Sequence, residues 1–328
     1  MLRPRGNLLS IKKDTMDSTK TQSKTEINAN GSSENGHAGE KKSARVEVLK
    51  TYKIYIDGKF PRTESGRYYI LDGGDGRQLA NICLSSRKDF RDAVVAARKA
   101  QPGWASKTAY NKGQVLYRIA EVLEGRKEQF VDELMRQGAG RASAEEEVNL
   151  SVDRLVHYAG WSDKFIQVFS SVNPVESSHF NFSLPEPTGV VSVISSEANG
   201  LIGLVSVIAP AIVGGNTVVV LASASKPLCA ISFAEVLQTS DVPAGVVNIL
   251  TGHEDELHQH FSSHMDVNAV VYCNTNAEHA KDIQTNSALN VKRALLYGKH
   301  DWMKEESQGP YFIMDLQEIK TTWHPIGI

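Results

Sequence analysis

The order of apolar and polar positions divides this chain of 328 residues into three regions. Residues 1–50 hold no Phe, Trp or Tyr and no periodic apolar face. From Ser86 to Phe169 apolar residues recur at helical spacing, whereas from Gly189 onward short Val- and Ile-rich runs alternate with segments of helix length. Strands and helices that alternate in this way are typical of an α/β protein with a parallel, doubly wound sheet.

Five apolar runs predict the strands of that sheet. They cover Val190–Ile194, Thr217–Leu221, Val246–Leu250, Ala269–Cys273 and Lys292–Tyr297. A further run, His179 to Leu184, alternates apolar and polar residues and ends at Pro185. We therefore expect this run to form a strand outside the core of the sheet.

Helices and hairpins are predicted ahead of the sheet. Ser86 followed by Asp89 is a capping-box pattern that marks the start of the first helix. One hairpin is predicted at the Asp57-Gly58 turn and another at the Gly-rich turn 72–76. The helices are predicted over residues 86–100, 111–137 and 144–169.

The segment from Leu201 to Leu221 carries no charge and approaches the length that crosses a bilayer. Pro210 and the Gly214-Gly215-Asn216 turn divide it into an apolar helix and a Val-rich strand. This division predicts a buried part of the sheet rather than a membrane span.

The chain has 36 Lys and Arg against 38 Asp and Glu, a formal net charge of −2. Such a balance gives no field of one sign for binding nucleic acid, so we expect no nucleic-acid partner. Cys83, Cys229 and Cys273 are odd in number and far apart. They predict neither a disulfide framework nor structural zinc, and a cytoplasmic location follows.

The first 50 residues carry ten basic and six acidic residues and no aromatic side chain. A segment of this composition cannot bury enough apolar area to become ordered, so we expect a disordered tail or linker. Because no acid precedes Asp14, a mitochondrial presequence is the alternative.

Seven short motifs follow one another in the order known from one enzyme family. They are Ile56-Asp57-Gly58-Lys59, Pro102-Gly103-Trp104, Leu116-Tyr117-Arg118-Ile119-Ala120, Tyr158-Ala159-Gly160-Trp161, Glu186-Pro187-Thr188-Gly189-Val190-Val191, Gly215-Asn216-Thr217-Val218-Val219-Val220 and Pro243-Ala244-Gly245-Val246-Val247-Asn248. With these motifs in this order, the chain resembles the aldehyde dehydrogenases between about Tyr52 and Tyr297.

The resemblance implies a Rossmann-type cofactor domain that binds NAD or NADP, an inserted catalytic domain and a bridging hairpin for oligomerisation. We expect an aldehyde dehydrogenase-like domain over 51–298, with its bridging strand at about 179–185, and a short C-terminal remnant over 299–328. We also expect most of the catalytic domain to be missing, because the roughly thirty residues after Tyr297 are too few for a domain.

Within the family, the chain most resembles the truncated second module of the tandem aldehyde dehydrogenase family sixteen. Ile319 to Pro325 resembles the strand that joins the oligomerisation hairpin near the family's C-terminus. Met1-Leu2-Arg3-Pro4 resembles the close of some family modules, so we expect a fragment of a longer protein.

The reactive residues of the family are absent from the matching positions. No cysteine follows Cys273, although the family needs a thiolate to attack the aldehyde. Ala198 takes the place of the family's oxyanion-stabilising Asn, unless a shift of one residue lets Asn199 replace it. Leu296 aligns with the Glu general base. No catalytic residue is therefore predicted.

The residues that hold the cofactor also differ from the family. Where the family has a Lys-Pro-Ala-Glu run, this chain has Leu221-Ala222-Ser223-Ala224. Where the family has Gly-Ser-Thr, this chain has Asn274-Thr275-Asn276. Two interpretations of Ser195 and Ser196 fit equally well: a contact to a phosphate, and a serine-rich turn without such a role. The remaining candidates for cofactor binding are Ser195, Ser196, Ser223, Gly252 and Thr275.

Three other features allow a functional and a structural interpretation. Cys273 ends a predicted strand and is either a relocated nucleophile or, as is more common, an inert buried thiol. The cluster of His258, His260 and His264 suggests a metal, but a solvated helix end explains it better. Glu145-Glu146-Glu147 is interpreted as an exposed first helical turn.

The sequence thus favours a non-catalytic module, or pseudoenzyme, with a scaffold or oligomerisation role. One alternative is an NAD(P)-dependent oxidoreductase that acts on aldehydes with a thiol supplied by another module. Another is a weak nucleotide-binding module. The expected partner is a second copy of the chain or a catalytic aldehyde dehydrogenase module.

Overall fold

The computed structural model describes residues 48–327, so most of the predicted tail lies outside the described residues. Its centre is a five-stranded, fully parallel sheet in the order β10-β9-β6-β7-β8. All five predicted strands are confirmed, with ends shifted by at most one residue. They are β6 (Val190–Ile194), β7 (Thr217–Leu221), β8 (Val247–Leu250), β9 (Ala269–Tyr272) and β10 (Arg293–Leu296).

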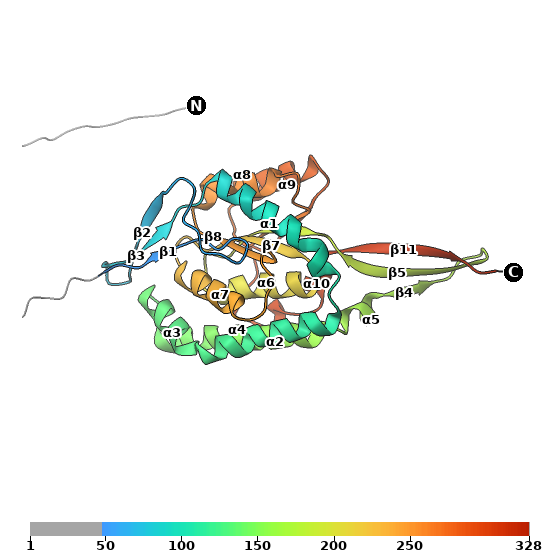
Figure 1. Cartoon of the computed structure of the whole chain (residues 1–328), viewed down its shortest axis with the longest axis horizontal. Helices are drawn as coiled ribbons and strands as arrows, with labels where there is room; N and C mark the ends of the chain where they lie inside the picture. Colours follow the sequence, from blue (N-terminus) through green and yellow to red (C-terminus); the bar gives the residue numbers. More distant parts are fainter. Residues whose placement is uncertain (1–47, 328) are drawn as a thin grey trace, which may run out of the picture. The chain divides into compact units, whose positions relative to one another are not determined.

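Helices cover both faces of this sheet (Figure 1). One face carries α1 (Arg87–Ala105), α8 (Glu254–Ser263) and α9 (Ala277–Ala288). The opposite face carries α2 (Ala109–Gly125), α3 (Lys127–Arg136), α4 (Arg141–Trp161), α6 (Ile202–Val213) and α7 (Leu228–Gln238). Each face has its own cluster of buried apolar side chains, so the prediction of a parallel α/β sheet is confirmed.

The first helix begins as its sequence predicts. The Ser86 side chain accepts a hydrogen bond from the Lys88 amide, and the Asp89 carboxylate accepts one from the Ser86 amide. The helix runs five residues beyond the predicted end and includes Pro102. Its inner face is buried, with Phe90 at 1% exposure.

The two longer predicted helices are each interrupted. The one at 111–137 becomes α2 and α3, because Arg126 leaves helical geometry and its guanidinium bonds to Gln129 and Glu235. The one at 144–169 becomes α4 and the short α5 (Phe165–Phe169). There the Ser162 hydroxyl bonds back to the Ala159 carbonyl and helps to end α4.

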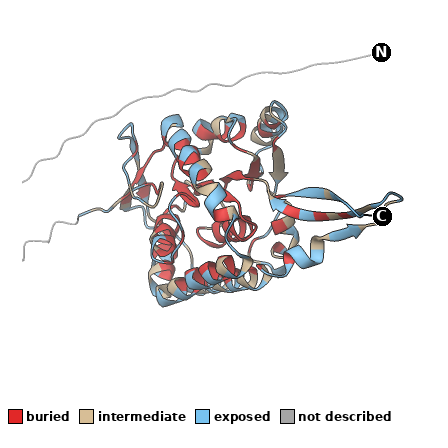
Figure 2. Cartoon of the chain, turned by 45° about the vertical axis from the view of Figure 1, so that its right-hand side comes forward, coloured by how far each residue is buried: buried red, intermediate tan, exposed pale blue. Residues whose placement is uncertain are grey.

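The α6 helix is buried along its whole length, which explains its lack of charge. Figure 2 shows buried residues concentrated in the centre of the body. Among the helices of the described region, none is both long and apolar enough to cross a bilayer.

A small sheet of β1 (Thr51–Tyr52), β3 (Gln78–Cys83) and β2 (Tyr68–Asp72) precedes α1. The hairpin predicted around turn 72–76 joins β2 and β3 and is confirmed. The hairpin predicted at Asp57-Gly58 is wrong as an extended element, because only Ile56 and Lys59 pair across it. Instead β1 runs parallel to β3, and Tyr55 pairs with Ile249 of β8.

A third sheet projects from the body (Figure 1) and consists of β11, β5 and β4. The strand predicted from His179 is β5 (His179–Pro187), and the strand predicted from Ile319 lies in β11 (Gln317–Pro325). The two run antiparallel over nine residue pairs, and β4 (Ser171–Asn173) adds to the other edge of β5. The short α10 (Tyr311–Met314) leads into β11.

Candidate functional site

The candidate cofactor residues gather at one edge of the parallel sheet. Ser195 and Ser196 follow β6, Ser223 follows β7, Gly252 follows β8 and Thr275 follows β9. Because parallel strands end at a common edge, the topology brings these positions together where α/β proteins bind their ligands. Whether they bind a cofactor stays a prediction.

The hydroxyls of the two serines after β6 are engaged within the chain. The Ser195 Oγ donates to the Leu221 carbonyl at 2.8 Å, and the Ser196 Oγ accepts from the Ala198 amide at 3.2 Å. Both side chains are buried. Their geometry is that of a turn and a strand end, which is the structural alternative named above.

The Glu197 carboxylate occupies the turn that follows β7. It accepts hydrogen bonds from the Ser223 hydroxyl at 2.7 Å, the Ala224 amide at 2.8 Å and the Ser225 hydroxyl at 2.8 Å. The Lys226 amine reaches back to the Ala198 carbonyl at 2.5 Å. The hydrogen-bond donors of this turn therefore already bind an anionic side chain.

Asn274 and Asn276 satisfy the polar groups at the end of β9. Asn276 caps α9, with its Oδ1 accepting from the amides of Glu278 and His279 at 3.0 and 3.3 Å. Asn274 accepts from the Glu197 amide at 2.9 Å and donates to the Glu254 carboxylate at 2.7 Å. The main-chain donors that begin α9 are thus engaged by the chain itself.

The two remaining candidates for cofactor binding differ in solvent exposure. Thr275 is exposed, whereas Gly252 is buried with a φ of +159°. A Cβ at Gly252 would lie 3.2 Å from a Leu257 methyl group. The glycine therefore permits close packing at this position.

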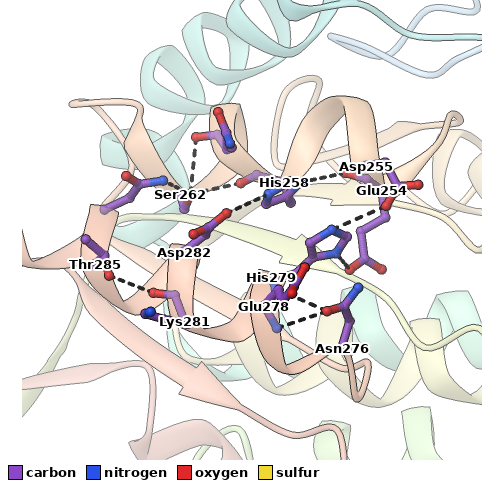
Figure 3. A network of polar contacts seen from close by, with 12 residues as sticks. Glu254, Asp255, His258, Ser262, Asn276, Glu278, His279, Lys281, Asp282 and Thr285 are labelled. Carbon is purple, nitrogen blue, oxygen red and sulfur yellow. Dashed lines mark hydrogen bonds and ion pairs between the residues drawn. The ribbon is translucent and has the colours of Figure 1, made fainter.

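A network of carboxylates and imidazoles joins α8 and α9 (Figure 3). The Glu254 carboxylate accepts from the Tyr272 hydroxyl at 2.6 Å and lies 2.5 Å from the His279 Nδ1. His279 stacks on His258, with ring centroids 4.0 Å apart, and His258 lies 3.4 Å from Asp282. The network ties both helices to the carboxyl edge of the sheet.

The structure corrects the interpretation of two charged clusters. His258 is only 6% exposed, so the predicted solvated helix end is wrong for this residue, although His260 and His264 are half-buried. Glu147 is also buried, because its carboxylate accepts from the Leu201 and Ile202 amides at 2.7 and 3.2 Å. It caps α6 rather than facing solvent.

None of the three cysteines is accessible in the described structure. Cys273 directly follows β9 and is 4% exposed. Burial, assisted by the nearby Glu254, raises the pKa of the Cys273 thiol, and burial likewise raises the pKa of Cys229. A raised pKa disfavours the thiolate that nucleophilic catalysis needs.

Known proteins that resemble this chain identify its family. A sequence profile described as the aldehyde dehydrogenase family matches residues 61–298. The chain belongs to this family. The resemblance inferred from the seven motifs is thereby confirmed at the level of the family.

Two curated relatives of this aldehyde dehydrogenase family member show how much of each protein is shared. Cytosolic 10-formyltetrahydrofolate dehydrogenase of Mus musculus is 30% identical over 264 residues, 78% of this chain and 29% of that protein. Omega-crystallin of Enteroctopus dofleini is 27% identical over 258 residues, 77% of this chain and 51% of that protein. The chain spans about half the length of such relatives, or less.

Solved structures agree with this assignment. The NAD⁺ complex of an aldehyde dehydrogenase from Bacillus cereus matches with a TM-score of 0.71 and 25% identity, over 75% of this chain and 50% of that one. PnpE from Pseudomonas sp. WBC-3 matches with a TM-score of 0.72 and 26% identity over the same shares. These matches support the α/β fold of the family.

Glu197 is the main residue that the sequence reasoning missed. It is the only charged residue between Glu186 and Lys226, within a stretch that is otherwise apolar or small. A lone carboxylate in a buried stretch needs hydrogen-bond donors, and this signal was present in the sequence. Its partners, however, come from a turn 26 to 28 positions away, which no local pattern indicates.

Proposed function

We propose that this chain is a non-catalytic aldehyde dehydrogenase-family module that acts as a scaffold or oligomerisation partner. The observation that carries the proposal is the engagement of the Glu197 carboxylate with the Ser223–Ser225 turn. This turn lies at the carboxyl edge of the sheet, where a cofactor of the family would approach. A negative charge there disfavours the phosphates of NAD or NADP.

The other polar groups of this edge support the same proposal. The side chains of Ser195 and Asn276 form hydrogen bonds within the chain, and the first amides of α9 donate to Asn276. A pyrophosphate normally binds to such free amides at a helix N-terminus. The residues present therefore do not fit NAD or NADP well, and no reaction step is assigned through either cofactor.

The chain also lacks an activated nucleophile among its described residues. The Cys273 sulfur is buried, and its raised pKa keeps it protonated at neutral pH. Leu296 is an apolar residue where the family has its general base. These features favour loss of catalysis over a relocated active site.

The projecting sheet offers the surface for a scaffold role. Phe180, Leu184, Ile319 and Trp323 are all exposed on β5 and β11. Apolar side chains on a sheet with open edges are typical of a protein interface. The proposed partner is a second copy of this chain or a catalytic aldehyde dehydrogenase module, as in a truncated second module of a tandem protein.

Two measurements on the full chain test the loss of catalysis. Calorimetry with millimolar NAD or NADP should give no binding heat, and an aldehyde panel should give no reduced cofactor. Reduction that Cys273→Ala abolishes would contradict the proposal. Turnover only after mixing with a catalytic module would instead support the alternative in which another module supplies the thiol.

The interface needs a separate test. Analytical ultracentrifugation should show an oligomer of the wild type that Ile319→Lys dissociates. Val95→Lys on α1 is the matched control, because Val95 is similarly exposed and lies outside the projecting sheet. A wild-type chain that neither self-associates nor binds a catalytic module would contradict the scaffold role.

A further inference from the structure

A cationic groove lies between α1 and the end of α8, away from the carboxyl edge of the sheet. Its volume is about 600 Å³, which falls within the usual range for small-molecule sites. Arg87 and Arg91 line one wall, and His260 and His264 line the other. No Asp or Glu is among the described residues that line it.

The arginines of this groove are incompletely neutralised. Arg87 is exposed, and the described residues provide its side chain with no hydrogen bond or ion pair. Arg91 pairs with its neighbour Asp92 at 2.9 Å, and both side chains remain about half exposed. Nearby Glu256 is engaged with Arg67 at 2.6 Å. A surplus of positive charge therefore remains at the groove.

The pKa values of both histidines in the groove are lowered, mainly by burial and then by nearby positive charges. Burial, followed by the charges of Arg87 and His258, lowers the pKa of His260. Burial also lowers the pKa of His264, where Asp266 opposes the effect and Lys292, Arg87 and Arg98 add to it. An anion bound between the walls would favour the protonated imidazoles and so reverse part of this effect.

An aromatic side chain forms the floor of the groove. Phe90 is almost fully buried and stacks on Phe261, with ring centroids 4.1 Å apart. His264 meets the Phe90 ring edge-on at 5.8 Å. A ligand held here would meet cationic walls and an apolar base.

The geometry points to a binding site for a small organic phosphate, with the phosphate between Arg87 and Arg91 and an apolar part beside Met265, an exposed side chain that lines the groove. Arginine guanidinium groups suit phosphate because two parallel N–H donors match two oxygens. The imidazoles of the opposite wall add positive charge when a bound anion favours their protonated form. This inference does not depend on the proposed loss of catalysis, because the groove shares no residue with the carboxyl edge.

The test uses the full chain with inorganic phosphate and phenyl phosphate as probes, at constant ionic strength. Proton NMR follows the ring signals of His260 and His264 during a pH titration. We expect both titration midpoints to rise with millimolar probe. We also expect phenyl phosphate to bind more tightly than inorganic phosphate, because its ring can contact the exposed side chain of Met265.

Matched variants separate a specific site from general attraction. Arg87→Gln with Arg91→Gln should weaken binding about tenfold or more, as expected for loss of charge-assisted hydrogen bonds. Arg77→Gln with Lys107→Gln removes the same charge at exposed positions outside the groove and should change binding little. Equal losses in both pairs, or unmoved His260 and His264 midpoints, would overturn the inference.

Discussion

The guanidinium of Arg154 on α4 donates a 3.1 Å hydrogen bond to the main-chain carbonyl of Trp302, in the segment after β10. The same side chain donates to the Ser206 hydroxyl at 2.6 Å and to the Ser307 carbonyl at 2.8 Å. It is 2% exposed, and burial lowers its pKa. One buried cation therefore fastens the segment that precedes α10 onto α4 and α6.

Arg154→Met should destabilise the chain by about 2–3 kcal/mol, because it leaves buried carbonyls without a donor. Urea unfolding followed by circular dichroism measures this change. Arg118→Met is the control, since Arg118 pairs with Glu121 on the surface and such pairs contribute about 1 kcal/mol or less. Equal losses in the two variants would show that Arg154 is not a special anchor.

Glu197→Gln should lower the free energy of unfolding by about 1.5–3 kcal/mol, the usual contribution of hydrogen bonds to a charged group. The amide keeps the shape of the side chain but offers one acceptor oxygen in place of two. Glu186→Gln is the matched control, because Glu186 is exposed and pairs with Lys320 at 3.1 Å. No greater loss in Glu197→Gln than in the control would contradict its structural role.

Lys292 should make stability depend on pH in the alkaline range. Burial lowers its pKa to about 8, from 10.5 in an unperturbed lysine. Between these values the unfolded chain binds more protons at this residue, so its contribution to stability rises with pH and is least favourable below pH 8. The change is about 1.4 kcal/mol for each pH unit.

Comparison of the wild type with Lys292→Met isolates this contribution. Unfolding curves between pH 8 and pH 9.5 avoid the region where tyrosines of the unfolded chain ionise. The difference in unfolding free energy between wild type and variant should shift in favour of the wild type as pH rises. A constant difference would show that the buried amine titrates normally.

The three cysteines should resist modification in the folded chain. All are buried, and burial raises the thiol pKa of Cys229 and Cys273. Ellman's reagent at neutral pH should therefore label them at the rate of unfolding and rapidly after denaturant is added. Prompt labelling of Cys273 in the native state would contradict this prediction and support a reactive thiol.

The sequence predicted the sheet well because its signals are local. Val190–Ile194 and Thr217–Leu221 are apolar throughout and bounded by turn residues, so both periodicity and composition agree. The break at Arg126 was missed because it depends on Glu235, which is 109 positions away. Helical periodicity alone cannot report such a tertiary contact.

The site was harder to predict because hydrogen-bond partners are not visible in a sequence. The family motifs located the beginnings of β6, β7 and β8, and the resemblance to the family followed from them. They did not indicate that Glu147 would cap α6 or that His258 would be buried against His279. In both cases a polar residue on a helix satisfied a partner from another element, against its average preference for solvent.

Ser183 of β5 and Thr321 of β11 share a 2.8 Å hydrogen bond across 138 positions of the chain. Bringing such distant segments together costs loop entropy, so we expect this ladder to form late in folding. Pulsed hydrogen exchange should protect the Val219 amide before the Phe182 amide, and the opposite order would contradict this. Assembly through the projecting sheet would then be open only to molecules whose core is already complete.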